Sequence, residues 1–245
     1  MTDMRTIDLN ADIGEGHPDD FALIEHATSV NIACGGHAGD DASMRISIEA
    51  SKAAGISIGA HPGYEDLENF GRVDLDLSPQ ELTDQLTRQL ERFLSMHPAL
   101  HHVKPHGALY NRANIDPSVA DITVHVIAEL QPKSLLYCPP YGELIKAANK
   151  VGLHTVQEGF IDRAYLGCGN LTPRTLTGAI IDNFNEAASQ AMQMVTTHSV
   201  VAIDGSQIAM PVQTICVHGD NQNALGLISF IRDLLNKAGV EIKSV

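Results

Sequence analysis

The sequence is poor in aromatic and in basic side chains, and both shortages exclude classes of partner. It contains no Trp, so it cannot build the Trp-lined platforms on which proteins stack sugar rings. Its 16 Lys and Arg residues are outnumbered by 30 Asp and Glu residues, which gives a formal net charge of −14. This charge argues against nucleic acid or an anionic membrane as a partner. It is compatible with a small anionic substrate, because the field inside a site can oppose the global charge.

Motifs that identify common cofactor sites are also missing. The four cysteines form no CxxC pair, which excludes zinc-ribbon and thiol-redox motifs. Cys34 and Cys216 lie within apolar runs and are predicted to be inert core residues. Neither a GxxxxGKS/T pattern nor a GxGxxG pattern occurs, so a P-loop and a Rossmann dinucleotide site are not expected.

Signals for membrane insertion or export are not evident either. No apolar run reaches the length of a membrane span. The N-terminus lacks the basic segment followed by an apolar segment that marks a secretory signal. We therefore expect a cytoplasmic protein with no membrane partner.

The remaining sequence repeats a short apolar run, a polar loop and an amphipathic helix, which predicts βα units and a parallel sheet. No Pro/Gly-rich linker interrupts the pattern, so one α/β domain over residues 1–245 is expected. The predicted strands are Arg5–Leu9, Val30–Cys34, Ser57–Ala60, His101–Lys104, Ser134–Cys138, Thr155–Glu158 and Thr214–Val217. Seven such units favour an irregular seven-stranded (β/α) barrel, and an open doubly wound sheet is the alternative.

Helix boundaries are marked by capping residues. Ser78 and Glu81 frame a capping box with Pro79 at the first turn. Asp116 and Pro117 open another helix. Two later helices are predicted over Gly178–Thr197 and from about Asn223 to Ala238, and a hairpin is predicted for residues 200–210, with a tight turn at residues 204–205.

Polar and titratable residues gather where the predicted strands end. They are Asn10, Asp12, Glu15, Gly35, Gly36, His37, Asp40, His61, Lys104, His106, Glu158, Asp162, Arg163, His218 and Asp220. In a parallel barrel all strand ends meet at one rim, where the βα-loops build active sites. The Gly-rich loop at Gly35 and Gly36 would let backbone N–H groups approach an anion at a helix start.

Each of these residues also has a purely structural interpretation. Asp40 and Asp220 precede helices and could be N-caps, and Arg163 could pair with a surface carboxylate. One His after a strand is usually a loop residue, but four of them at the same end of the strands favour a site. The other eight of the 12 His residues are interpreted as structural.

Longer motifs resemble the LamB/YcsF family over essentially the whole chain. They are residues 10–15 (NADIGE), 31–40 (NIACGGHAGD), 58–63 (IGAHPG), 103–111 (VKPHGALYN), 162–163 (DR), 171–174 (LTPR) and 215–220 (ICVHGD). The chain departs from the family pattern at Ala11, at Gly36 and in residues 69–73. The resemblance implies a seven-stranded barrel similar to that of polysaccharide deacetylases.

The resemblance further implies the A component of an ATP-dependent 5-oxoprolinase, which converts 5-oxoproline, ATP and water to L-glutamate, ADP and phosphate. Subunits B and C of that enzyme would be the partners, ATP the cofactor, and Mg²⁺ its companion. In such a reaction Asp12 or Glu15 could act as base and His37, His61 or His106 as proton donor. Cationic donors for phosphate and substrate carboxylate would be Lys104, Arg163 and Arg174, and phosphate-bound metal could be held by Asp12, Asp40 and Asp220.

Two other functions fit the same residues. A metal-dependent deacetylase or amidohydrolase could hold Zn²⁺ with Asp12, His37 and His61 or His106, and would need no ATP. Alternatively, the chain could be a binding module that presents its ligand to partner subunits and catalyses nothing alone.

Overall fold

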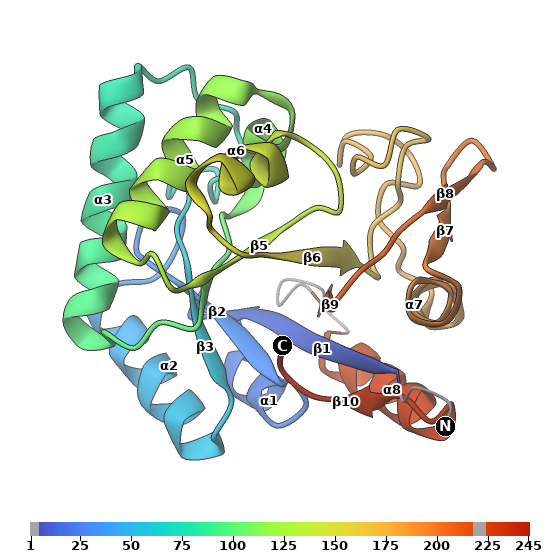
Figure 1. Cartoon of the computed structure of the whole chain (residues 1–245). Helices are drawn as coiled ribbons and strands as arrows, with labels where there is room; N and C mark the ends of the chain where they lie inside the picture. Colours follow the sequence, from blue (N-terminus) through green and yellow to red (C-terminus); the bar gives the residue numbers. More distant parts are fainter. Residues whose placement is uncertain (1–4, 218–223) are drawn as a thin grey trace.

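The computed structural model describes residues 5–217 and 224–245, and its centre is a closed barrel of seven parallel strands (Figure 1). Neighbouring strands follow the order β1-β2-β3-β4-β5-β6-β9, and β9 pairs back onto β1 to close the barrel. The strands are β1 (Thr6–Ile13), β2 (Ser29–Ala33), β3 (Ser57–His61), β4 (His102–Val103), β5 (Leu135–Cys138), β6 (Thr155–Phe160) and β9 (Thr214–Val217). The seven-stranded barrel prediction is confirmed, and the open sheet is wrong.

Helices surround the barrel (Figure 1). They are α1 (Asp20–Ile24), α2 (Asp41–Ala54), α3 (Pro79–Met96), α4 (Gly107–Ile115), α5 (Pro117–Leu130), α6 (Glu143–Val151), α7 (Phe184–Thr197) and α8 (Ala224–Lys237). Parallel neighbours need a crossover between them, and these helices supply it. None of the helices in the described part of the chain is long and apolar enough to cross a membrane.

Strand β1 runs further than its apolar sequence predicts, to Ile13 instead of Leu9. Asp8, Asn10 and Asp12 alternate with apolar residues, and all three side chains are buried. Because successive strand side chains point to opposite faces, these three point into the barrel while Leu9 and Ile13 face the helices. The predicted end at Leu9 is wrong, because polar residues on a buried interior face resemble the start of a loop.

The predicted capping signals are confirmed at several helices. Ser78 accepts from the Glu81 N–H and the Glu81 side chain accepts from the Ser78 N–H, so the capping box at α3 is complete. Asp116 accepts from two N–H groups at the start of α5. Gly55 and Gly152 end α2 and α6 with left-handed backbone, a conformation that glycine adopts without strain.

Helix α7 is shorter than predicted. It begins at Phe184, after the Asn183 side chain accepts from two N–H groups, whereas the sequence predicts a start near Gly178. Gly178 has a φ of +80° and Ile180 is exposed. Ile180 and Ile181 lie four and three residues before Phe184, so their spacing from Phe184 imitates a helical period although both precede the helix.

Three strands lie outside the barrel proper. The predicted hairpin is confirmed: β7 (Ser199–Val201) and β8 (Gln207–Ala209) pair antiparallel and project beside α7 (Figure 1). The third, β10 (Glu241–Ile242), follows α8 and was not predicted. It pairs parallel with the first residues of β1.

A core substitution tests how much of the stability depends on the layer between helices and barrel. Phe93 on α3 is fully buried, whereas Phe21 on α1 is 50% exposed. Phe93→Ala should lower the free energy of unfolding by about 3–5 kcal/mol, because it removes buried surface and leaves a cavity. Phe21→Ala should change it by less than about 0.5 kcal/mol. Urea unfolding monitored by circular dichroism measures both, and equal losses would contradict the assignment of the core.

Candidate active site

The interior of the barrel is polar toward the N-terminal ends of its strands. Asp8 on β1 is almost fully buried, and its carboxylate accepts hydrogen bonds from Thr28, Ser29, Tyr137 and Thr214 at 2.5–3.1 Å. Burial raises the pKa of Asp8, and the four hydroxyl donors oppose that shift. These donors satisfy a carboxyl group that would otherwise be costly to bury.

A chain of amides connects this layer to the C-terminal strand ends. The Asn10 amide donates to Thr214 Oγ1 at 2.7 Å and to Glu158 Oε1 at 2.9 Å. The Asn31 amide donates to Asn10 Oδ1 at 2.8 Å and to Asp12 Oδ1 at 2.7 Å. Each amide nitrogen thus donates two hydrogen bonds, and the last of them, from Asn31, holds the Asp12 carboxylate in place.

His102 determines the orientation of Asn31. Its Nε2 lies 2.7 Å from Asn31 Oδ1, so it must donate, and the Asn31 amide nitrogen is thereby turned toward Asp12. The His102 ring stacks on Tyr137 with centroids 3.9 Å apart. Burial lowers the pKa of His102 well below its ordinary value, which keeps the ring neutral.

Lys104 is a buried cation between two carboxylates. Its Nζ lies 2.8 Å from Asp12 Oδ1 and 2.9 Å from Glu158 Oε1, and its side chain is 2% exposed. Burial alone would lower the pKa of Lys104. Attraction from Asp12, Cys216 and Glu158 outweighs burial and holds that pKa well above its usual range. Lys104 is therefore an ammonium group and not a base.

Three imidazoles and one carboxylate cluster beside this ion pair. His37 and His106 stack with centroids 3.5 Å apart, and His61 meets both rings edge-on. Glu15 Oε1 lies 3.0 Å from His37 Nε2 and 3.6 Å from His106 Nδ1. Burial lowers the pKa of His37 to about 3 and that of His106 well below its ordinary value.

Hydrogen bonds to carbonyl groups fix two of the tautomers. His61 Nδ1 lies 2.7 Å from the Lys104 carbonyl, and His106 Nε2 lies 2.9 Å from the Phe70 carbonyl. A carbonyl only accepts, so these nitrogens carry the protons. In the neutral rings the lone pairs then lie on His61 Nε2 and His106 Nδ1, which are 3.0 Å apart. Two lone pairs at this distance repel unless a cation lies near both.

A divalent metal fits this arrangement. Glu15, His37, His61 and His106 each offer one ligand atom, and the four atoms lie within 4.8 Å of one another. Metal-bound imidazoles usually donate their other N–H to a carbonyl or carboxylate, as His61 and His106 do here. Imidazole and carboxylate together suit zinc and neighbouring transition metals. The predicted ligand set of Asp12, His37 and either His61 or His106 lacked Glu15, and both His61 and His106 belong to the cluster. Asp12 lies beside it, with Oδ2 3.4 Å from His61 Nε2.

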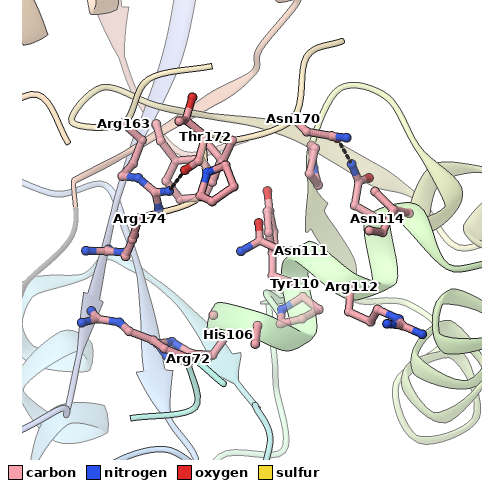
Figure 2. Close-up of a pocket in the computed structure, with 18 of the residues that line it drawn as sticks. Arg72, His106, Tyr110, Asn111, Arg112, Asn114, Arg163, Asn170, Thr172 and Arg174 are labelled. Carbon is pink, nitrogen blue, oxygen red and sulfur yellow. Dashed lines mark hydrogen bonds between the residues drawn. The ribbon is translucent and has the colours of Figure 1, made fainter. Parts of the chain in front are cut away.

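A cavity of about 700 Å³ opens above the site. Its floor contains Asp12, His61, Lys104 and Glu158, and further residues come from α4 and from residues 163–175. Figure 2 shows Arg72, Arg163 and Arg174 on one side and Asn111 with Asn114 on the other. The volume is that of a small-molecule site.

Most predicted site residues converge, and a few do not. Asp12, Glu15, His37, His61, Lys104 and His106 lie in direct contact around the barrel mouth, with Asn10 beneath and Arg163 and Arg174 in the cavity wall. Asp40 is exposed and caps α2, so its structural interpretation holds. Gly35 and Gly36 pack against Arg92 and Gln89 of α3 and do not line the cavity. His218 and Asp220 lie outside the described residues.

Sequence analysis missed several polar residues that support the site. They are Asn31, His102, Tyr137 and Thr214, which point into the barrel from β2, β4, β5 and β9. The signal was present, because a polar residue at every second position of a buried strand predicts a polar interior face. His102 in particular is among the histidines that the sequence interpretation treats as structural.

The fold and the site define an α/β-barrel protein with a carboxylate–histidine–lysine centre at the C-terminal ends of its strands. Residues 7–245 match the sequence model of the LamB/YcsF family, and the chain belongs to that family. The lactam utilization protein from Thermus thermophilus is 36% identical, with a TM-score of 0.89. The match covers 98% of this chain and all of that one.

More distant structures share the barrel. The family 4 carbohydrate esterase from Streptomyces lividans, in complex with acetate, is 11% identical with a TM-score of 0.54. The match covers 98% of this chain and 93% of the esterase. An uncharacterized protein from Agrobacterium tumefaciens C58 is 11% identical with a TM-score of 0.62, over 100% of this chain and 89% of its own. At such identities the likeness shows the fold alone.

Metal titration tests the histidine cluster directly. Purified protein should bind one Zn²⁺ or Co²⁺ per chain. Calorimetry measures binding of either ion, and the Co²⁺ absorption band gives a second measurement. His106→Ala should weaken binding by more than about 100-fold, because losing a ligand costs more than losing the hydrogen-bond partner of a ligand. His125→Ala removes an exposed histidine on α5 and should leave binding unchanged. Equal affinity of the His106→Ala and wild-type proteins would rule out this ligand set.

Proposed function

We propose that this protein hydrolyses the C–N bond of a cyclic amide, and that it is the A component of an ATP-dependent 5-oxoprolinase in the cytoplasm. The reaction would convert 5-oxoproline, ATP and water to L-glutamate, ADP and phosphate, with subunits B and C as partners. The observation that carries the proposal is the buried Asp12–Lys104–Glu158 group beside three histidines, at the floor of a cavity of small-molecule size. Membership of the LamB/YcsF family, and the similarity to a lactam utilization protein, supply the substrate class.

The chemistry of a lactam explains the need for ATP. The ring amide is stabilised by resonance, so attack by water on its carbonyl carbon is slow. Transfer of a phosphoryl group from ATP to the amide oxygen would release ADP and make the ring carbon a better electrophile for water. The adduct would then expel the ring nitrogen, which takes up a proton, and the acyl phosphate that remains would be hydrolysed to glutamate and phosphate. The nucleotide would then take part in bond breaking, and cationic side chains are required to hold the phosphate.

The residues at the cavity floor suit three roles in this reaction. Asp12 lines the cavity and would accept the proton of the attacking water. Lys104 remains protonated and would stabilise negative charge that develops on the lactam oxygen. Glu15, His37, His61 and His106 would hold a divalent metal, which when bound would polarise a carbonyl or a water molecule.

Replacement of the base tests this assignment. Asp12→Asn should lower kcat of the assembled enzyme about 10²–10⁴-fold, because the amide cannot accept a proton. Asp84→Asn makes the same change at an exposed position of α3 and should leave kcat unaltered. Glutamate release from 5-oxoproline measures the rate, and thermal melting confirms folding. Unchanged turnover by a folded Asp12→Asn protein would exclude Asp12 as the base.

The cluster of three histidines also favours a second function, a metal-dependent amide hydrolase that needs no ATP. One assay separates the two functions. ADP and glutamate are measured with 5-oxoproline, with this chain alone and with the two partner subunits, in the presence and absence of a chelator. Equal amounts of ADP and glutamate that depend on the partners support the oxoprolinase. Glutamate formation that ignores ATP but stops with the chelator supports the second function.

A further inference from the structure

Arg163 is a buried cation in the cavity wall, and its side chain is held by neutral groups. It is 5% exposed. Nη2 donates to the Thr172 carbonyl at 2.6 Å and Nε donates to the Ala179 carbonyl at 3.3 Å (Figure 2). Among residues 5–217 and 224–245 it forms no ion pair with a carboxylate within 4 Å, although the charge of the adjacent Asp162 partly offsets its own. A guanidinium has five N–H donors, and these two bonds leave donors available toward the cavity.

The position of this guanidinium is fixed by its surroundings. The Gln190 amide, from α7, donates to the carbonyl groups of both Phe160 and Arg163 at 2.8 Å. The next residue, Ala164, donates its N–H to the Ala179 carbonyl at 3.0 Å. Backbone and side chain of Arg163 are therefore held from three directions. A ligand that binds to a group already in place loses less ordering entropy.

Further positive charge lies in the same wall. Arg72 and Arg174 line the cavity on the same side as Arg163 (Figure 2). Burial, and next the charge of Arg174, lower the pKa of Arg163 to about 10. Positive charge is therefore concentrated here in a chain whose formal net charge is −14. An anion in the cavity would relieve both the burial of the charge and the repulsion.

Thr172, whose carbonyl accepts from Arg163, carries a buried hydroxyl group beside the cavity wall. It is fully buried and lines the cavity, and within the described residues its Oγ1 has no hydrogen-bond partner. Unsatisfied buried hydroxyls are rare because each costs free energy. A hydroxyl and a guanidinium both donate hydrogen bonds, so both can bind the oxygen atoms of one ligand.

We infer that Arg163 and Thr172 form a subsite for the carboxylate of a lactam acid, while the ring amide lies over Asp12 and Lys104. This inference rests on the proposed function, because it names the anionic part of that substrate. The competing interpretation is that Arg163 only ties the segment 161–181 together. If Arg163 only stabilises this segment, its replacement lowers the stability of the protein and not the preference for a ligand. If it belongs to a carboxylate subsite, its replacement removes the preference for a charged over an uncharged ligand.

Calorimetric titration with a matched pair of ligands tests the subsite. The probes are 5-oxo-L-proline and 2-pyrrolidinone, which share the lactam ring and differ in the carboxylate. The wild-type protein should prefer the acid by about 10- to 100-fold, the range for a charged hydrogen bond. Arg163→Gln should abolish the preference. Arg112→Gln is the control, because Arg112 also lines the cavity but pairs with Asp74 and Asp116.

Two further measurements keep the outcomes distinct. Arg163→Lys retains the charge but loses the planar donor fork, so a folded protein with a reduced preference supports the subsite even if Arg163→Gln unfolds. An unchanged preference in either folded variant overturns it. Inorganic phosphate should compete with 5-oxo-L-proline for the wild-type protein. If the wild type binds phosphate through Arg163 but does not bind the lactam acid, both the proposed substrate and its carboxylate subsite are wrong, and Arg163 belongs to a site for a different anion. If 5-oxoproline is turned over and no anion depends on Arg163, the subsite alone fails.

Discussion

The arrangement of the whole site depends on one buried ammonium group. Lys104 is 2% exposed and lies between Asp12 and Glu158. Removing one partner of such a pair leaves an isolated charge and costs about 3–5 kcal/mol. The same residue fixes a neighbour through its backbone, because its carbonyl accepts from His61 Nδ1. Lys104 thus sets both the position of the Asp12 carboxylate, through its ammonium group, and the tautomer of His61, through its carbonyl.

This charge imposes a polar interior on the barrel. Parallel barrels are usually filled by branched apolar side chains, yet here Asp8, Asn10, Asn31 and Thr214 occupy the interior and bond to one another. Such a network contributes less hydrophobic stabilisation than aliphatic packing would. The apolar layer therefore lies outside, where Leu9 and Ile13 of β1 belong to the same buried cluster as Phe93 of α3.

Much of the architecture could be predicted from the sequence, because β-branched runs, caps and glycines report local structure. The number of barrel strands and the convergence of His37, His61, Lys104 and His106 followed from this alternation and from topology. The end of β1 and the start of α7 could not be placed. In β1 the polar residues face the barrel interior. After Gly178, Ile180 and Ile181 stand at helical spacing from Phe184 although they precede α7.

The set of metal ligands and the polar network beneath them depend on side-chain directions, which the spacing of residues in the sequence does not encode. Glu15 joins the histidines because the chain turns after β1 and directs its side chain toward His37. The sequence placed Asp12 and Glu15 together at one strand end without separating their roles. Asn31 and His102 were hard to recognise as interior residues, because Asn31 lies between Val30 and Ile32 and β4 has only two residues, too few to show an alternating pattern. His218 and Asp220 stay predictions.

Strand β10 has a topological consequence. It pairs with the first residues of β1, with Thr6 opposite Glu241, and this contact lies at the end of the barrel away from the candidate site. The first and last described segments are therefore adjacent in space. After β10 the chain continues across the neighbouring strands, where Ser244 bonds to Ser57 and the Val245 carbonyl accepts from His101, so one segment connects β1 to the starts of β3 and β4.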